Sequence, residues 1–373
     1  MAPEAVEAMR HYLTVADTFA NPASIQHHLG QNAESCVEQA RAQIAELFSA
    51  KKKDLIFTSG ATESNNLAIQ GIAQAYRKQG NHIITSAIEH KSVLDTCKHL
   101  ESQGFSLTYL RPNSEGQVAV NDVLQSLTDD TILVSIMYAN NETGIIQPVD
   151  ELAHALADQK PFFHVDAAQV AGKLPIDLAT TPIDLLSISA HKFYGPKGCG
   201  ALYIRDCNRT QLTPIMYGGG QEHRLRPGTL PTHQIMAMTT ALKLAHDNMA
   251  SDFEHCQTLK QSLLTRLKQI EGMTINGSTT KALPNIVNVS FEQVGSDALL
   301  IALNNQLAIS SGSACNSGAV EASHVLRAMG IEGDRLYGAV RISFGRYTTA
   351  KEINRAGEIL TKEVLRLRAL AQE

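Results

Sequence analysis

The chain has 373 residues, of which 43% are hydrophobic and 18% are charged, as in an ordinary globular protein. This length exceeds what one compact core usually holds and predicts two domains. The net charge of −5, without a long run of Lys or Arg, argues against direct binding of nucleic acid. The longest apolar stretches are too short to span a membrane.

The cysteines and the first residues bear on the cellular compartment. Residues 1–18 alternate charged and small residues without the apolar core of a signal peptide, so we expect a cytoplasmic protein. No two cysteines form a C-x-x-C pair, which argues against a zinc or dithiol redox site, and we expect no metal. In a reducing cytoplasm the cysteines are expected to be free thiols. They are Cys36, Cys97, Cys199, Cys207, Cys256 and Cys315.

Apolar runs and helical patterns alternate along the first two thirds of the chain. The predicted strands are 55–58, 82–85, 106–110, 131–137, 162–165, 185–188 and 201–204. The predicted helices are 33–47, 64–77, 92–103, 149–158 and 232–248. Continuous apolar strands that alternate with helices are typical of a parallel sheet covered on both faces. We therefore predict an α/β domain over residues 1–250, with a mostly parallel sheet of the seven-stranded type.

After residue 250 the pattern has fewer strands and longer helices. We predict helices at 253–271, 296–305 and 350–371, strands at 286–290, 307–310 and 339–344, and a loop at 311–323. This mixture is typical of a smaller α+β domain, which we place at residues 251–373.

Polar side chains follow the carboxyl ends of five predicted strands. In open α/β sheets this edge is where ligands bind, and five polar clusters together indicate a site. The clusters are 58–64, Glu89-His90, 140–142, 166–169 and 189–192.

Lys192 lies in a turn between two apolar strands. Burying an ammonium group is costly unless it is paired or converted, for example into a Schiff base with an aldehyde cofactor. A solvated loop lysine is the alternative, and this segment alone does not decide between them. Asp166 adds the acid that a pyridoxal phosphate enzyme needs against the pyridinium nitrogen. Together the two residues favour a pyridoxal phosphate site, where Gln169 could donate to the ring hydroxyl.

A phosphate group would need donors nearby. The turn Ser59-Gly60-Ala61-Thr62 joins a strand to a helix and could present backbone N–H groups to an anion, although an ordinary helix cap is the more common explanation. Ser189, His191 and Thr229 could add side-chain donors. His90 could stack on an aromatic ring, but a lone histidine more often has a structural role.

Two residues of the second domain are candidates for chemistry. Cys315 lies in a Gly/Ser-rich loop, where a nucleophile would be exposed and mobile; a catalytic and an incidental cysteine are equally compatible with that loop. Arg341 lies on a predicted strand between apolar residues. A guanidinium there suits a clamp on a substrate carboxylate, and a structural ion pair is the alternative.

The chain resembles the cysteine desulfurases of the class V aminotransferase superfamily, which have pyridoxal phosphate fold type I. The resemblance covers nearly the whole chain, and the motif around Cys315 is its most specific part, because related aminotransferases lack it. The matching segments are FTSGATESNNLAI, EHKSVLDTC, MYANNETG, HVDAAQVAGKLPIDL, SAHKFYGPKGCGALY, RPGTLPTHQI and SSGSAC.

The resemblance implies a role for each candidate residue. Lys192 would form the Schiff base with pyridoxal 5'-phosphate, and Cys315 would receive the sulfur of L-cysteine as a persulfide while L-alanine is released. The remaining roles are the pyridine nitrogen for Asp166, the ring hydroxyl for Gln169, ring stacking and proton transfer for His90, the phosphate for Ala61, Thr62, Ser189, His191 and the partner subunit's Thr229, and the substrate carboxylate for Asn141 and Arg341.

The resemblance also implies partners and alternatives. A homodimer is expected, together with a sulfur-acceptor protein that serves as an iron–sulfur scaffold or a thiolation relay. A selenocysteine lyase or a class V aminotransferase is one alternative function. Another is a desulfurase-like partner protein with impaired turnover, because the family's N-terminal stretch Tyr-Leu-Asp-x-x-Ala-Thr-Thr-Pro has no counterpart in this sequence.

Overall fold

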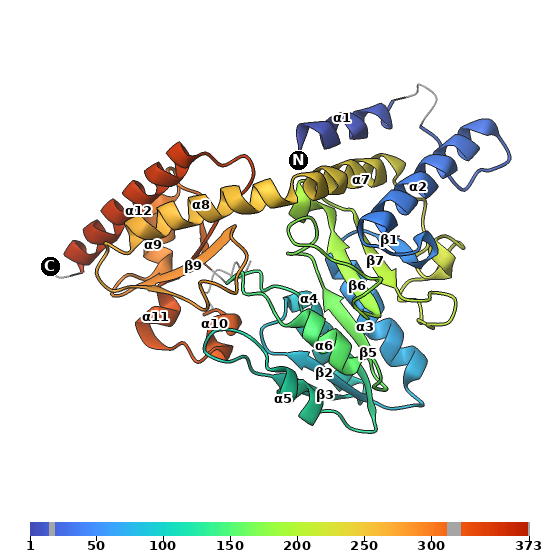
Figure 1. The fold of residues 1–373 in the computed structure, drawn as a ribbon, viewed down its shortest axis with the longest axis horizontal. Helices are drawn as coiled ribbons and strands as arrows, with labels where there is room; N and C mark the ends of the chain where they lie inside the picture. The colour runs from blue at the N-terminus through green and yellow to red at the C-terminus, as the bar shows by residue number, and fades with distance from the viewer. Residues whose placement is uncertain (15–18, 312–321, 372–373) are drawn as a thin grey trace. The chain divides into compact units, whose positions relative to one another are not determined.

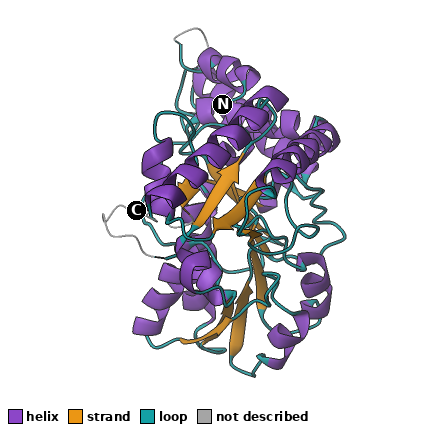
Figure 2. Ribbon diagram, turned by 90° about the vertical axis from the view of Figure 1, so that its left-hand side faces the viewer, coloured by secondary structure: helices purple, strands orange, loops and turns teal. Residues whose placement is uncertain are grey.

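The computed structural model describes residues 1–14, 19–311 and 322–371, and it divides them into two compact units. The first unit comprises residues 1–110, 120–138 and 148–249. The second comprises residues 111–119, 139–147 and the described part of 250–373. Figure 1 shows the elements of both units, and Figure 2 shows the strands flanked by helices.

The first unit is built on one seven-stranded sheet with the order β1-β7-β6-β5-β4-β2-β3. Its apolar strands are almost entirely buried, whereas the edge strand β3 exposes Ser106. The continuous burial explains why the sequence shows uninterrupted apolar runs rather than alternation. The strands are β1 (Leu55–Thr58), β2 (His82–Ser86), β3 (Ser106–Leu110), β4 (Thr131–Ser135), β5 (Phe162–Asp166), β6 (Leu185–Ser189) and β7 (Gly200–Ile204).

Strand β7 is the one strand of this sheet that runs antiparallel to its neighbours; the other adjacent pairs are parallel. The chain passes from β6 to β7 through the short 3-10 helix η2 (Ala190–Phe193) and a brief turn. This connection is too short for the crossover that a parallel neighbour requires. Gly200 consequently pairs with Ser189 on one side and with Thr58 on the other.

Helices cover the sheet and complete the core of the first unit. Helix α3 contacts β4, β5, β6 and β7, and α4 packs against α3. Their apolar faces form one core with the sheet, in which Ile56, Leu67 and Ile83 are fully buried. The helices are α1 (Pro3–His11), α2 (His28–Leu47), α3 (Ala61–Tyr76), α4 (Lys91–Ser102), α5 (Val120–Gln125), α6 (Val149–Leu156) and α7 (Thr232–Asp247), with 3-10 turns η1 (Lys52–Asp54) and η3 (Glu222–Arg224).

The second unit has a four-stranded antiparallel sheet in the order β10-β11-β9-β8. A core that includes Leu263, Val289 and Leu360 joins this sheet to its helices. The strands are β8 (Met273–Ile275), β9 (Ile286–Phe291), β10 (Ser310–Ser311) and β11 (Ala339–Ser343). The helices are α8 (Met249–Leu267), α9 (Ser296–Leu303), α10 (His324–Ala328), α11 (Gly333–Tyr337) and α12 (Ala350–Leu370).

One predicted strand differs in the structure. The sequence predicts a strand over 307–310, but the strand found there is Ser310–Ser311. The N–H groups of Gln306 and Leu307 bond to the carbonyl of Leu303, so the end of α9 uses the backbone that a longer strand would need.

Candidate active site

The candidate site begins where β5 and β6 end. These strands are parallel neighbours in register, with Asp166 opposite Ser187. Asp166 is the last residue of β5, and Ser189, the last of β6, leads directly into η2 with His191 and Lys192. The carboxylate and the lysine therefore follow adjacent strands at one sheet edge, which is the ligand-binding edge of such sheets.

The carboxylate of Asp166 is buried and is held on both oxygens. Only 6% of the residue is exposed. The backbone N–H of Ala168 donates to Oδ1 at 2.9 Å, and Nδ2 of Asn65 donates to Oδ2 at 2.7 Å. Two donors fix the carboxylate in one orientation, in which it can bind a cationic atom of a ligand.

Asn65 links Asp166 to His90. Its Nδ2 also donates to Oγ of Ser92 at 2.9 Å, and that hydroxyl lies 2.8 Å from Nδ1 of His90. The backbone N–H of Ser92 donates to the same Nδ1 at 3.1 Å, so Nδ1 is the acceptor and Nε2 carries the ring proton when His90 is neutral. The imidazole caps the start of α4 in this orientation. The sequence analysis did not identify Asn65 and Ser92 as site residues. The only sequence feature that could have indicated them is their position in the segments FTSGATESNNLAI and EHKSVLDTC.

The turn between β1 and α3 packs closely on the end of β6. Gly60 has φ +148°, and a Cβ there would lie 3.3 Å from Oγ of Ser189. A Cβ on Gly200 would lie 2.6 Å from the Cα of Gly60, so glycine is needed at both positions. Within the described residues no side chain caps α3, which leaves the N–H groups of Ala61 and Thr62 directed beyond the helix end. Such a turn can receive an anion.

Cations surround the same edge. Oγ of Ser189 lies 2.9 Å from Nδ1 of His191. Partial burial lowers the pKa of His191, and the positive charges of Lys192, Lys197 and Lys173 lower it further. The imidazole is therefore neutral near pH 7 and can donate one hydrogen bond, while the lysines supply a positive potential for an anion.

Glu89 is a second buried carboxyl group close to this edge, immediately before His90. Its Oε1 accepts hydrogen bonds from Oγ of Ser86 at 2.7 Å and from the N–H of Met137 at 2.8 Å. Burial raises the pKa of Glu89 to about 8; the two hydrogen bonds oppose this rise and the charge of Asp166 adds to it. Glu89 therefore holds a proton near pH 7, and Asp166 carries its charge without a second charge beside it.

The other two candidates of the first unit, Gln169 and Thr229, lie outside the helices and strands. Gln169 is 9% exposed, and its carbonyl accepts a hydrogen bond from Nζ of Lys173 at 2.8 Å. Thr229 lies on an exposed segment that precedes α7.

Two candidates of the second unit, Asn141 and Arg341, are in contact. Nη1 of Arg341 donates to the carbonyl oxygen of Asn141 at 2.9 Å. Nε of Arg341 is buried and has no hydrogen-bond partner among the described residues. A guanidinium with a buried unused donor is suited to an anionic ligand, because an unmade hydrogen bond there is costly. Cys315 lies outside the described residues.

Two searches of the described residues bear on other classes of site. In residues 1–14, 19–311 and 322–371, no group of three or more His, Cys, Asp or Glu side chains is placed to hold a metal ion. Within the same ranges, no helix is both long enough and apolar enough to cross a membrane.

Comparisons with known proteins place this chain in a family. The sequence matches the aminotransferase class-V family over residues 1–356. It is 48% identical to "Cysteine desulfurase IscS" of Vibrio vulnificus (strain YJ016), over 99% of this chain and 91% of the relative, and 48% identical with the same coverage to the protein of that name from Shewanella sp. (strain W3-18-1).

Solved structures agree with this match. A "NIFS-LIKE PROTEIN" superimposes with a TM-score of 0.90 at 34% identity, covering 98% of this chain and 96% of the other. The "Crystal structure of DndA from streptomyces lividans" gives 0.81 at 42% identity, with coverages of 92% and 96%. "SspA in complex with cysteine" gives 0.83 at 37% identity, with coverages of 94% and 97%. The chain therefore belongs to the aminotransferase class-V family of pyridoxal phosphate enzymes, and within that family to the cysteine desulfurases.

The residues described above fit this cofactor. Asp166 is a buried carboxylate that needs a cationic partner, such as a protonated pyridine nitrogen. The uncapped start of α3 and the cationic edge around His191 suit a phosphate group. Lys192 follows the strand next to that of Asp166 and is the amine that an aldehyde group requires.

Proposed function

We propose that this chain is a pyridoxal phosphate-dependent cysteine desulfurase that converts L-cysteine to L-alanine and carries the sulfur as a persulfide on Cys315. The observation that carries the proposal is the buried carboxylate of Asp166, held by Asn65 next to the turn that contains Lys192. The named relatives, which are 48% identical over nearly the whole chain, support the reaction.

In this proposal the first unit holds the cofactor. Lys192 binds its aldehyde group, Asp166 its pyridine nitrogen and Gln169 its ring hydroxyl, while His90 stacks on the ring. The phosphate is bound by Ala61, Thr62, Ser189 and His191, together with the partner subunit's Thr229. When bound, the cofactor withdraws electrons from the substrate's α-carbon. The roles of residues 1–250 as the cofactor domain and of 251–373 as the domain of the Cys315 loop belong to the same proposal.

Other side chains would bind the substrate and transfer protons. Arg341 and Asn141 bind the carboxylate of L-cysteine, and the unused Nε of Arg341 supports this role. Lys192 can take and return protons at Nζ, and His90, held at Nδ1 by Ser92, can do so through Nε2.

Sulfur transfer requires the thiolate of Cys315. It attacks the sulfur of the substrate, so that an S–S bond forms and the C–S bond breaks. The electron pair of the C–S bond stays with the carbon, which takes up a proton and leaves as the methyl group of alanine. The persulfide then passes its outer sulfur to an acceptor.

The proposal also covers the binding partners and the cellular compartment. We expect a cytoplasmic homodimer, because Thr229 would act on the partner subunit, and a sulfur-acceptor protein of iron–sulfur cluster assembly or of a thiolation relay. The name of the relatives supports the first kind of acceptor. A selenocysteine lyase or class V aminotransferase is the second candidate.

One experiment tests the reaction. The purified chain should show the absorbance of bound cofactor, and L-cysteine with a thiol reductant should yield equal amounts of alanine and sulfide. Lys192→Ala should be colourless, and Cys315→Ser should release no sulfide, whereas Cys36→Ser should behave as wild type. Transamination that survives Cys315→Ser would favour the aminotransferase. A coloured wild type that yields no alanine would favour a partner protein without turnover.

A further inference from the structure

Residues 221–229, here called the 221–229 segment, lie between β7 and α7, have a strained backbone and include Thr229. Three consecutive residues other than glycine, Glu222, His223 and Arg224, have positive φ angles of 47°, 55° and 67°. Such residues rarely adopt this region, and a run of three persists only where the surrounding contacts hold it. The contacts of this segment are therefore informative.

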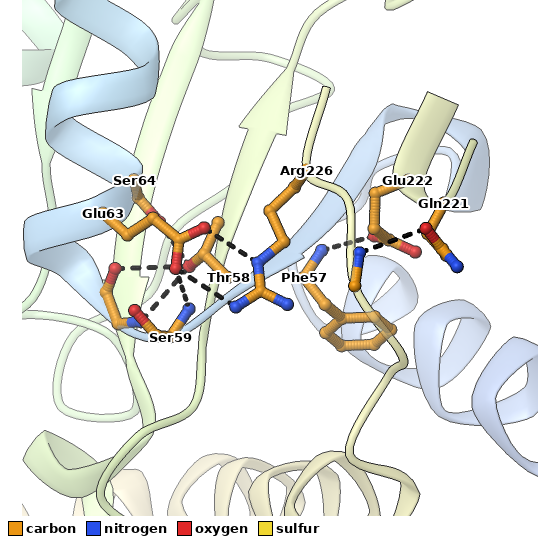
Figure 3. A network of polar contacts seen from close by, with 10 residues as sticks. Phe57, Thr58, Ser59, Glu63, Ser64, Gln221, Glu222 and Arg226 are labelled. Carbon is orange, nitrogen blue, oxygen red and sulfur yellow. Dashed lines mark hydrogen bonds and ion pairs between the residues drawn. The ribbon is translucent and has the colours of Figure 1, made fainter. Parts of the chain in front are cut away.

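One anchor is the carboxylate of Glu222. It is paired with Arg41 at 2.7 Å, and its Oε2 accepts the backbone N–H of Phe57 at 2.6 Å. Within the segment, Oε1 of Gln221 accepts the N–H of Gly228 at 3.1 Å, which closes the turn. Figure 3 shows the contact between Glu222 and the backbone of Phe57, with Gln221 close by.

A second anchor is the ion pair between Arg226 and Glu63, also drawn in Figure 3. Nε of Arg226 lies 2.8 Å from Oε1 of Glu63, and Nη2 lies 3.4 Å from Oε2. The two side chains are only 20% and 11% exposed, so solvent screens the pair weakly. This anchor lies three residues before Thr229 and joins the segment to the first turn of α3.

Glu63 is also part of the turn to which we assign the phosphate. Its Oε2 accepts the N–H of Ser59 at 2.7 Å and thereby holds the backbone that leads to Ala61 and Thr62. Partial burial would raise the pKa of Glu63, but the hydrogen bonds from Arg226 and Ser59 lower it below its ordinary value. Glu63 therefore places a negative charge at the proposed phosphate-binding turn. Without a neighbouring cation, this charge would repel the phosphate.

We infer that Arg226 and Glu63 are a pair of positioning residues for the cofactor: Glu63 shapes the phosphate-binding turn, and Arg226 offsets its charge while fixing the 221–229 segment to that turn. This inference rests on the proposed function. It also ties Thr229, proposed to reach the partner's phosphate, to the phosphate-binding turn of its own subunit.

The test measures cofactor affinity rather than turnover. The full-length chain is stripped of cofactor and titrated with pyridoxal 5'-phosphate. Arg226→Gln leaves Glu63 uncompensated and should weaken binding by about tenfold or more. Glu63→Gln keeps an acceptor for Ser59 and should not weaken binding. The double variant restores charge balance and should bind more tightly than Arg226→Gln. Arg226→Lys should bind better than Arg226→Gln.

Arg205→Gln is the matched control. Arg205 belongs to the same unit and donates to the carbonyls of Leu178, Thr181 and Ile183, so its loss removes a half-buried guanidinium of purely structural role. It should leave the affinity for pyridoxal phosphate unchanged. A double variant as weak as Arg226→Gln, or Glu63→Gln as weak as Arg226→Gln, would overturn the role of charge.

A second readout needs no cofactor. Arg224 is exposed within the strained run, and the bond after it is a trypsin site that the anchors should protect. In the stripped chain, Arg226→Gln and the double variant should be cut after Arg224 faster than wild type, whereas Arg205→Gln should not. Equal cutting rates for wild type and Arg226→Gln would overturn the claim that Arg226 anchors the 221–229 segment. If the wild type binds no pyridoxal phosphate, the proposed function fails, and the cutting rates still report on the anchor.

Discussion

Asn65 holds Asp166 from a helix more than one hundred positions away in the sequence: its Nδ2 lies 2.7 Å from Oδ2 of the carboxylate. The same amide donates to Ser92 and, through that hydroxyl, reaches His90. The proposed ring-nitrogen and ring-stacking residues are thus joined by one buried amide. Any movement of α3 relative to β5 would disturb both.

We expect Asn65→Ala to weaken cofactor binding and to lower the free energy of unfolding by about 1–3 kcal/mol, because the buried Oδ2 of Asp166 loses its side-chain donor. Titration with pyridoxal phosphate and urea unfolding measure the two effects. Asn81→Ala is the control, since Asn81 is exposed and makes one long hydrogen bond to the carbonyl of Gly104. Affinity and stability equal to those of the control would show that Asn65 does not hold the carboxylate.

Glu89 predicts a pH dependence of stability. Its pKa is about 8 in the folded chain against an ordinary value of 4.5, so between these values the folded chain binds more protons than the unfolded chain. The contribution of Glu89 to the free energy of unfolding therefore falls as pH rises through this window, by at most about 1.4 kcal/mol per pH unit. It is fully present below the unfolded pKa.

The variant Glu89→Gln removes this titration and retains acceptor capacity for Met137. As the pH rises from about 5 to about 8, the free energy of unfolding of the variant should increase steadily relative to that of the wild type. Urea unfolding followed by circular dichroism at several pH values in this range measures the difference. Glu34→Gln, on an exposed position of α2, is the control variant. A pH-independent difference for Glu89→Gln would contradict the raised pKa.

The sheet was predictable because its strands carry their own signal. The run at 55–58 matches β1 at both ends, since a strand buried on both faces reads as a continuous apolar stretch. The run at 106–110 matches β3 at both ends as well, although this edge strand is only partly buried. Helices α10 and α11 were missed, because five residues give little more than one turn of periodicity. Strand β8 has three residues and was missed for the same reason.

The site was predictable only in part. Asp166 and Lys192 follow strand ends, and a sequence shows where strands end. Asn65 and Ser92 became visible only through contacts across 101 and 27 positions, which depend on how α3 and α4 pack against the sheet. The raised pKa of Glu89 likewise arises from burial, which local sequence does not reveal.

The pair Arg41–Glu222 should show the cost of an unpaired buried charge. Their side chains are 8% and 2% exposed. Arg41→Met should lower the free energy of unfolding by about 3–5 kcal/mol, because Glu222 stays buried without its cation. Arg41→Met combined with Glu222→Gln should cost less, since no charge remains and the glutamine still accepts from Phe57.

Urea unfolding of the single and double variants measures this difference. The control is Arg10→Met, because Arg10 pairs with Glu7 on the surface, where the side chains are 74% and 77% exposed. Its effect should stay within about 1 kcal/mol. A double variant less stable than Arg41→Met would show that the pair acts through its shape rather than its charge.

Arg341 should govern the binding of substrate more than its turnover. Nη1 donates to the carbonyl of Asn141, while the buried Nε has no hydrogen-bond partner among the described residues. In the proposed function, this Nε would donate to the carboxylate of L-cysteine. Arg341→Gln should therefore raise KM for L-cysteine about tenfold to a hundredfold, as expected for the loss of a charge-assisted hydrogen bond, with a smaller fall in kcat. Arg335→Gln, which affects a guanidinium bonded to Asn276 in the same unit, should leave KM unchanged. Steady-state alanine release measures both parameters, and an unchanged KM with a reduced kcat in Arg341→Gln would instead place Arg341 with the residues that act after substrate has bound.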